Sequence, residues 1–254
     1  MNTISLDLNC DAGESTGTNK TGNDAELFRY VTSVNIACGF HAGDPSVMRE
    51  TVELAMKNGI AIGAHPSFPD LAGFGRKEMQ LTVQEIYDII IYQAGALYAV
   101  VKSQEGKLHH IKPHGALYNM AAQNKKMADA IVNAIFDFDK NLILYGLSGS
   151  ELIGAAKEKG LRVANEVFAD RTYTDNGNLT PRNEKNALIT DVNQSLEQVL
   201  MMVNEKKVKT TGNRLISIDA DTVCIHGDAD HAVEFAKAIR KKFLENKIAV
   251  QTFN

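Results

Sequence analysis

Four of the seven histidines lie where a short apolar run ends and a loop containing glycine or proline begins. They are His41, His65, His114 and His226, in the stretches VNIACGFHAGDP, IAIGAHPSFPD, LHHIKPHGALYN and TVCIHGDAD. Near neutral pH an imidazole can act as an acid, a base or a metal ligand. Because parallel strands end at the active-site edge of an α/β sheet, we expect these four side chains to gather there.

Polar side chains also follow the first apolar run, where NCDAGES contains Asn9, Asp11 and Glu14. A carboxylate at a strand end can be a general base, a metal ligand or a partner that orients a histidine. Asp and Asn before Gly also commonly form a turn and nothing more, so this string alone favours turn chemistry. Gly13 leaves the backbone free to approach a ligand.

Asp11 and three of the histidines, His41, His65 and His114, could form a metal site with nitrogen and oxygen ligands. They could equally serve as acid, base and hydrogen-bond donors. One histidine at a strand end is most simply a hydrogen-bonded turn residue, whereas four at one edge favour function. The spacing does not distinguish metal binding from acid–base chemistry.

Lys112 precedes His114 in the string IKPHGALYN. Alternation along a strand places residues 110, 112 and 114 on one face, so Lys112 and His114 could both point into a barrel. A lysine there is costly unless it is paired or contacts an anionic ligand. The simpler alternative is a solvated lysine at a frayed strand end.

Two long irregular stretches, residues 65–80 and 166–190, follow strand-like runs and are expected over the same edge. Their charged side chains could bind a carboxylate or phosphate or polarise water, although loop charges are usually only solvated. These candidates are Arg76, Glu166, Asp170, Arg171 and Arg182. After His226, Asp228 is more simply a cap of the last helix than a catalytic group.

These side chains need a scaffold of alternating strands and helices, and the apolar periodicity predicts one. Strand-like runs lie at residues 4–9, 33–37, 60–64, 108–112, 141–146, 161–165 and 222–226. Helical patterns lie at residues 46–59, 83–106, 124–139, 150–160, 192–206 and 232–247. Predicted helix starts are Asp44 with Pro45, Thr82 with Glu85, and Ser148 with Glu151.

Strands separated by single helices run parallel, and this many units in 254 residues is typical of a β/α barrel. We therefore predict an α/β fold, a single TIM-like barrel domain of seven or eight strands over residues 1–254. An open doubly wound sheet is the alternative.

The composition limits the class of partner. A net charge of −4 and an isoelectric point near 6.0 give no indication of nucleic-acid or anionic-membrane binding. No apolar span is long enough to cross a membrane, and no secretion signal is visible, so we expect a cytoplasmic protein. The three cysteines have no metal-binding or disulfide spacing and fit reduced thiols.

The sequence contains no complete copy of the common nucleotide-binding or metalloprotease motifs. Gly17 and Gly22 have the spacing of a phosphate-binding P-loop, but Asn23 and Asp24 stand where Lys and Ser or Thr are required. No GxGxxG follows a strand, and no HExxH occurs.

Six strings, LNCDAGE, NIACGFHAGDP, IGAHPSFPDLAGFGR, KPHGALYN, VFADRTY and HGD, resemble the LamB/YcsF family in order, from about residue 6 to 228. The resemblance implies a barrel related to the polysaccharide-deacetylase type. It also implies ATP-dependent opening of 5-oxo-L-proline to L-glutamate, with two further subunits, B and C. ATP would be a co-substrate, with Mg²⁺, and the subunit that binds it stays open.

Under this interpretation, Asp11 with His41, His65 or His114 supplies the general acid and base. The residues predicted to bind substrate or phosphate are Asn9, Glu14, Arg76, Lys112, Glu166, Asp170, Arg171 and His226. Two alternatives remain: a metal-dependent, deacetylase-like hydrolase that uses an Asp and two histidines, and a non-catalytic subunit that delivers substrate to its partners.

Overall fold

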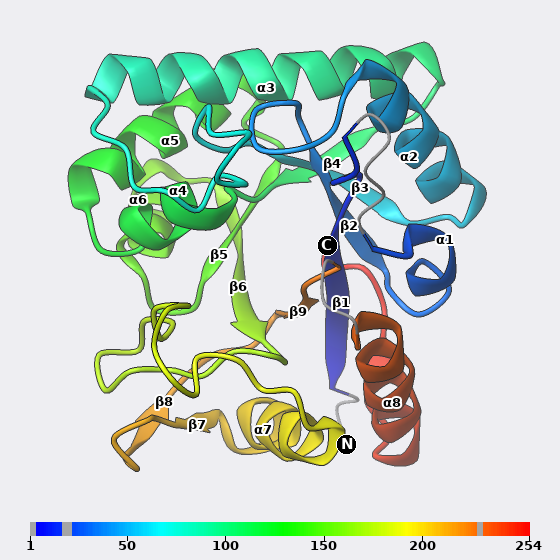
Figure 1. Ribbon diagram of the computed structural model, residues 1–254, viewed down its shortest axis with the longest axis vertical. Helices are drawn as coiled ribbons and strands as arrows, with labels where there is room; N and C mark the ends of the chain where they lie inside the picture. The colour runs from blue at the N-terminus through cyan, green and yellow to red at the C-terminus, as the bar shows by residue number, and fades with distance from the viewer. Residues whose placement is uncertain (1–3, 17–21, 228–230) are drawn as a thin grey trace.

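Within residues 4–16, 22–227 and 231–254, the part of the chain that the computed structural model describes, seven parallel strands form the centre of the molecule (Figure 1). The strands are β1 (Ser5–Ala12), β2 (Ser33–Ala37), β3 (Ala61–His65), β4 (Leu108–Ile111), β5 (Ile143–Leu147), β6 (Arg162–Phe168) and β9 (Thr222–Ile225). All seven runs predicted from the sequence form strands, with small shifts at their ends.

The sheet closes into a barrel because β1 has a partner on each side. Asp11 lies opposite Asn35 on β2, and Cys10 lies opposite Ile225 on β9. The prediction of a β/α barrel is therefore confirmed, with seven strands. The open doubly wound sheet is excluded, because an open sheet would leave β1 and β9 unpaired with each other.

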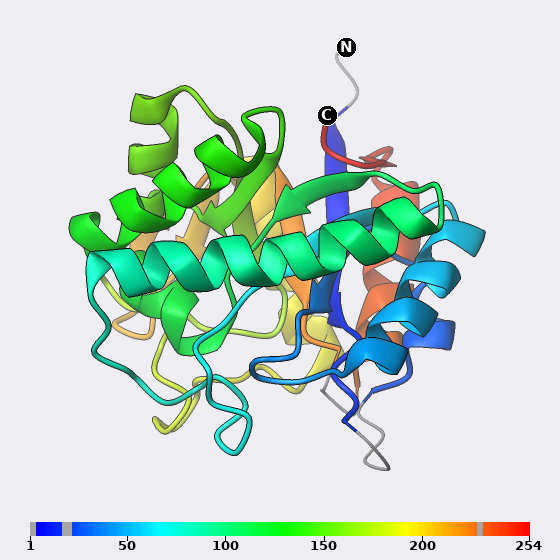
Figure 2. The same ribbon diagram turned by 90° about the horizontal axis from the view of Figure 1, so that it is seen from above.

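Helices form an outer layer around the strands, and Figure 2 shows the longest, α3, lying across them. The helices are α1 (Asp24–Leu27), α2 (Pro45–Lys57), α3 (Val83–Ser103), α4 (Gly115–Ala121), α5 (Lys125–Asp139), α6 (Glu151–Lys159), α7 (Val192–Glu205) and α8 (Ala232–Glu245). The six predicted helices are present. The sequence missed α1 and α4, which are too short to show an apolar period.

Side-chain caps fix where the helices begin. The Asp44 carboxylate accepts hydrogen bonds from Ser46 N and Val47 N at the start of α2, as predicted. Thr82 and Glu85 form the predicted capping box. The prediction that Ser148 caps α6 is wrong, because a turn there delays the helix and Ser150 accepts from Ile153 N instead.

Three short strands lie outside the predicted set. β7 (Lys207–Lys209) and β8 (Leu215–Ser217) form an antiparallel pair, and β10 (Ala249–Val250) pairs parallel with β1. Runs of two or three residues carry too little alternation to be recognised in a sequence.

The barrel interior is polar, which is the feature that creates a site. Along β1, Leu6 and Leu8 join the hydrophobic core while Asp7, Asn9 and Asp11 alternate with them and are buried. The side chains of Ser33, Thr222 and Tyr145, among others, donate hydrogen bonds to Asp7. Burial nonetheless raises the pKa of the Asp7 carboxyl, despite these donors.

One close approach inside the barrel requires glycine. A Cβ atom at Gly63 on β3 would overlap the imidazole ring of His110. That ring stacks on Tyr145 with centroids 4.0 Å apart and bonds Asn35 Oδ1 through Nε2 at 2.8 Å. No role is predicted for His110 from the sequence, and it lies in the barrel interior below the pocket residues.

None of the described helices combines the length and apolarity that a membrane span requires. Cys10, Cys38 and Cys224 are buried and form no disulfide, as expected.

Candidate functional site

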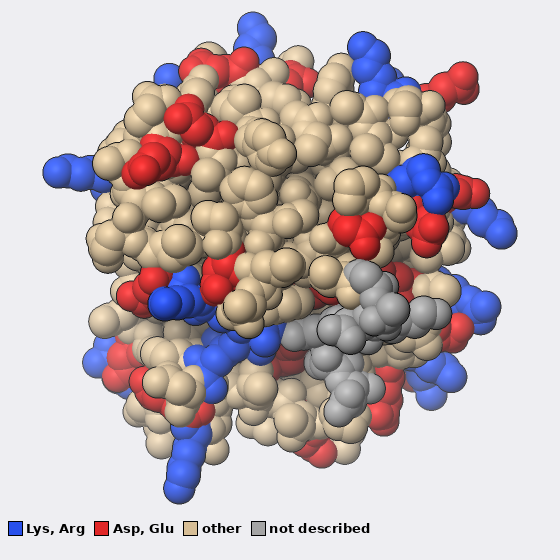
Figure 3. All heavy atoms as spheres, turned by 45° about the horizontal axis from the view of Figure 1, so that its top comes forward, with Lys and Arg blue, Asp and Glu red and all other residues tan. Residues whose placement is uncertain are grey.

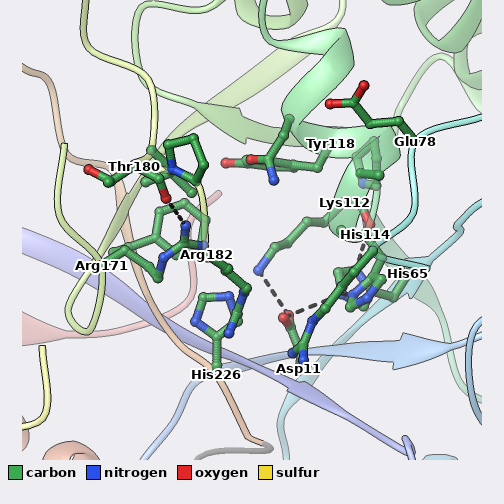
Figure 4. A pocket seen from close by; sticks show the side chains of 18 of the residues that line it. Asp11, His65, Glu78, Lys112, His114, Tyr118, Arg171, Thr180, Arg182 and His226 are labelled. Atoms are coloured by element: carbon green, nitrogen blue, oxygen red, sulfur yellow. Dashed lines mark hydrogen bonds and ion pairs between the residues drawn. The ribbon is translucent and has the colours of Figure 1, made fainter. Parts of the chain in front are cut away.

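A pocket of about 460 Å³ opens at the carboxyl ends of the strands. Its volume is within the range of small-molecule sites, about 300–1,000 Å³. Both long loops, residues 65–80 and 166–190, contribute to its wall, as predicted. Figure 4 shows Lys112 between His65 on one side and Arg171 on the other.

Lys112 is buried between two carboxylates. Its Nζ atom lies 2.9 Å from Asp11 Oδ1 and 2.9 Å from Glu166 Oε1. The prediction that Lys112 points into the barrel is confirmed, and its anionic partners are protein carboxylates. One ammonium and two carboxylates leave an excess of negative charge beneath the pocket.

These neighbours set the protonation of the group. Burial would raise the pKa of the Asp11 carboxyl, but His65 and Lys112 outweigh it and hold the pKa well below its usual range. Burial would likewise lower the pKa of the Lys112 ammonium, but Asp11, Cys224 and Glu166 raise it well above normal. Asp11 and Lys112 are therefore both charged at neutral pH.

A layer of amides holds the carboxylates from below. Asn35 Nδ2 donates to Asp11 Oδ1 at 2.9 Å and to Asn9 Oδ1 at 2.8 Å. Asn9 Nδ2 in turn donates to Glu166 Oε1 at 3.1 Å and to Thr222 Oγ1 at 2.7 Å. Asn9 and Glu166 are fully buried, so they position Asp11 and Lys112 from behind the pocket wall.

His65 and His114 meet at the ends of β3 and β4. His65 Nε2 lies 2.9 Å from His114 Nδ1 and 3.4 Å from Asp11 Oδ2. The remaining nitrogens lie beside backbone carbonyls: His65 Nδ1 is 2.7 Å from Lys112 O, and His114 Nε2 is 2.9 Å from Phe74 O. The backbone therefore fixes the orientation of both rings.

His41 packs behind this pair and is completely buried. Its ring stacks on His114 with centroids 3.8 Å apart, and its Nε2 lies 3.4 Å from Glu14 Oε1. Burial, reinforced by His65, lowers the pKa of His41 well below normal. Burial, with His41 and His65, does the same to the pKa of His114, so both rings are neutral at neutral pH.

The loop after β3 covers the histidines. The Phe74 ring meets the His41 and His114 rings edge-on, with centroids 5.6 and 5.4 Å away. Phe74 and Gly75 both have positive φ angles, 55° and 65°. Gly75 is required because a Cβ there would lie 2.8 Å from His41 Cβ and would overlap Ser67 Oγ.

Guanidinium groups line the opposite wall. Arg171 Nη2 donates to Thr180 O at 2.6 Å, and its Nε donates to Ala187 O at 3.3 Å. Burial and the nearby Arg182 lower the pKa of Arg171 to about 10, which still leaves it charged at neutral pH. Arg76 and Arg182 line the same pocket.

His226 reaches the pocket from the end of β9. Its Nδ1 lies 2.8 Å from Asp170 Oδ2, and its ring stacks on Phe168. Burial would raise the pKa of Asp170, but His226 and Arg171 lower it, so the carboxylate stays ionised and orients the imidazole.

The predicted site residues divide into two groups. Those that line the pocket are Asp11, His65, Arg76, Lys112, His114, Arg171 and His226. Those that are buried behind it are Asn9, Glu14, His41, Glu166 and Asp170. Asp228, the predicted helix cap, and Gly17, the first glycine of the incomplete P-loop spacing, lie outside the described residues.

Sequence reasoning missed several pocket residues, among them Glu78, Tyr118, Asn119 and Gln123. Tyr118 OH donates to Glu166 Oε2 at 2.7 Å. The sequence held no signal for Tyr118, because it lies on α4, a helix of seven residues that is too short to show an apolar period. Glu78 lies in an irregular loop, where no periodic pattern in the sequence indicates which way a side chain points.

Fold and site together define a parallel β/α-barrel protein whose carboxyl edge carries a histidine–carboxylate cluster. The model of the LamB/YcsF family matches residues 6–254, and the chain belongs to this family. The resemblance seen in the sequence motifs is therefore confirmed.

Related proteins match along nearly the whole chain. A protein from Tolumonas auensis that is named as the A subunit of 5-oxoprolinase is 54% identical over 246 residues, covering 97% of this chain and 98% of its own. The crystal structure of a lactam utilization protein from Thermus thermophilus has a TM-score of 0.92 and 44% identity, covering 98% of this chain and all of its own. The structure of T48 deacetylase, at 11% identity and a TM-score of 0.50 over 99% of this chain and 89% of its own, shows the shared fold alone.

Proposed function

We propose that this chain carries the lactam-opening site of a 5-oxoprolinase, which converts 5-oxo-L-proline to L-glutamate with hydrolysis of ATP to ADP and phosphate. The observation that carries the proposal is the buried Asp11–His65 pair, which faces a pocket with Arg171 across it. The names of the related proteins, a 5-oxoprolinase component and a lactam utilization protein, support the same substrate class.

The chemistry requires activation because a five-membered lactam is a resonance-stabilised amide with little strain. Phosphorylation of the lactam oxygen makes the ring carbon a better electrophile. Water then adds to that carbon, the carbon–nitrogen bond breaks and the nitrogen takes a proton, which leaves an acyl phosphate. A second water hydrolyses the acyl phosphate to the carboxylate of L-glutamate and inorganic phosphate. Asp11 Oδ2 and His65 Nε2, which are 3.4 Å apart, are the atoms placed to accept and return that proton.

The anionic parts of the substrates need positive charge in the same pocket. Asp11 and Glu166 already engage the ammonium of Lys112, so we assign it to positioning Asp11. Arg171, Arg76 and Arg182 line the wall and can hold a carboxylate or phosphate through paired N–H donors.

The place of ATP is a separate part of the proposal. The sequence contains no complete P-loop, so ATP with Mg²⁺ binds either in this pocket or on a partner subunit. Calorimetric titration of the isolated chain with ATP and 5-oxoproline, separately and together, distinguishes the two. If titration of the isolated chain with ATP gives a binding heat, the nucleotide site lies on this chain. If it gives no binding heat, the site lies on a partner subunit.

The proposal includes assembly with two further subunits. Figure 3 brings the α3 side of the molecule forward and shows charges of both signs around a broad uncharged area. α3 exposes Val83, Tyr92 and Tyr98, and we place the contact with a partner subunit on this face.

The test of the catalytic site is Asp11→Asn in the assembled enzyme. We expect glutamate formation to fall at least about a hundredfold, the usual scale for loss of a general acid or base. The matched control is Asp219→Asn, which removes an exposed carboxylate that lies outside both the pocket and α3. Near-normal turnover by Asp11→Asn, with the fold intact by circular dichroism, would refute the assignment.

A further inference from the structure

The hydrogen bonds of His65 and His114 constrain where their protons lie. Lys112 O and Phe74 O are acceptors only, so the nitrogens beside them, His65 Nδ1 and His114 Nε2, must carry hydrogen. When both rings are neutral, the other two nitrogens present lone pairs. Those nitrogens, His65 Nε2 and His114 Nδ1, face each other at 2.9 Å.

Two facing lone pairs repel, so this geometry calls for a positive charge between the rings. A proton on one ring could supply it, or a metal ion bound by both nitrogens. A proton shared between His65 and His114 would need no other partner. A metal ion would need further ligand atoms close to these two nitrogens.

Further ligands are present. Both ring nitrogens of His41 are buried and form no hydrogen bond. Glu14 Oε1 lies 3.4 Å from His41 Nε2 and 3.7 Å from His114 Nδ1. One ligand atom from each of Glu14, His41, His65 and His114 lies within 4.8 Å of all the others.

We propose that Glu14, His41, His65 and His114 bind one divalent transition-metal ion of the zinc or ferrous-iron kind. Three imidazoles and one carboxylate are a donor set that such ions accept, at about 2.0–2.2 Å from the metal. The four ligand atoms already lie within 4.8 Å of one another, so these side chains can surround a single ion. The proposal does not depend on the 5-oxoprolinase assignment.

The surroundings have the features of a preformed metal site. His65 and His114 each donate their outer N–H to a backbone carbonyl, the usual way in which proteins orient metal-bound imidazoles. Gly75 allows the covering loop to approach His41 and His114 closely. Asp11 Oδ2 lies beside His65 on the pocket side, which would leave Asp11 to handle the proton when His65 is a ligand.

The test uses the full chain without a histidine tag, stripped with a chelator and titrated with Co²⁺ and then Zn²⁺. We expect one equivalent of Co²⁺ to bind with a visible ligand-field absorption, and Zn²⁺ to displace it. In the protein without substitutions, long-range ¹H–¹⁵N spectra should show that metal binding shifts the ring-nitrogen resonances of His41, His65 and His114. The resonances of the exposed His231 should not shift.

Substitutions then identify the ligands. Glu14→Gln and His41→Gln should each weaken Co²⁺ binding at least about tenfold, while the matched control His231→Gln should bind as the parent does. The proposal is overturned if the parent shows no saturable binding. It is also overturned if neither ligand variant weakens binding, or if the ring nitrogens that shift belong to other histidines. Because the imidazole spectra need no variant, misfolding of His41→Gln leaves the test intact.

Discussion

At the scale of single residues, Lys112 shows why the site tolerates so much buried charge. Removing an ammonium and two carboxylates from water is costly, and the attraction of each carboxylate to the ammonium at 2.9 Å offsets that cost only while the ammonium is present. The amides of Asn9 and Asn35 satisfy remaining lone pairs of the carboxylates. Loss of the ammonium therefore leaves both carboxylates uncompensated, whereas loss of one carboxylate leaves a balanced ion pair.

We predict that Lys112→Met lowers the free energy of unfolding by about 3–5 kcal/mol at pH 7, because two buried carboxylates lose their cation. Urea denaturation measures this directly. Adding Glu166→Gln should restore part of the loss, since one carboxylate is then neutral. The control Lys107→Met, which removes an exposed lysine just before β4, should change stability by less than about 0.5 kcal/mol. Equal losses in Lys112→Met and Lys107→Met would contradict this account.

At the scale of elements, the loop between β3 and α3 is the lid of the histidine cluster. It supplies the Phe74 carbonyl to His114 and the Phe74 ring to both His41 and His114. Its turn depends on two consecutive residues with positive φ. Such backbone is costly for residues other than glycine and is kept where function depends on it.

Gly75→Ala should therefore destabilise the protein by more than about 1 kcal/mol and displace the loop, because the new Cβ overlaps Ser67 and crowds His41. Thermal unfolding and the imidazole spectra report the two effects. Gly154→Ala is the control, since it lies in α6 with open space around it and should raise stability by roughly 0.5–1 kcal/mol. A Gly75→Ala protein as stable as the parent would show that the turn is not under this constraint.

The sequence predicted the strands themselves better than the orientation of the side chains at their ends. The seven strands followed from apolar runs, and the strand ends carried His65, His114 and Asp11 to one pocket. Knowing that a residue follows the carboxyl end of a strand does not tell whether its side chain faces the cavity or lies behind it. His41 ends such a run and is nonetheless completely buried, because the Phe74 turn folds over it.

The barrel interior was harder still to predict. Asn35 lies in the middle of an apolar strand, and its bonds to Asn9 and Asp11 depend on the register between β1 and β2. Register results from the packing of the whole sheet and leaves no local signal. Tyr118 belongs to a helix of seven residues, too short for a period to be read.

At the scale of the whole molecule, buried neutral histidines make stability depend on pH. The pKa values of His41, His110 and His114 are lowered by burial, well below the ordinary 6.5. Below pH 6.5 the unfolded chain takes up protons on these rings that the folded chain does not, so stability is present above that pH and is lost as pH falls.

We predict that the free energy of unfolding, measured by urea denaturation in the presence of a chelator, falls between pH 7 and 5.5. Each histidine contributes about 1.4 kcal/mol per pH unit below its unfolded-state pKa, so three together can approach about 4 kcal/mol per unit. His114→Gln should reduce the slope by about one proton. A flat profile over this range would show that the rings are not held neutral.

The closure of the barrel has a consequence for how the site comes into being. β1 pairs with β9, and the hydrogen bond from Asn9 to Thr222 spans 213 residues of sequence. During synthesis, the strand that bears Asp11 leaves the ribosome long before its second neighbour, β9, has been made. The contact between Lys112 Nζ and Cys224 Sγ, which are 3.0 Å apart, likewise forms only after β9 has been made. Until then the nascent chain holds a row of polar groups without their final partners, so the order of translation delays completion of this buried polar layer until β9 has been made.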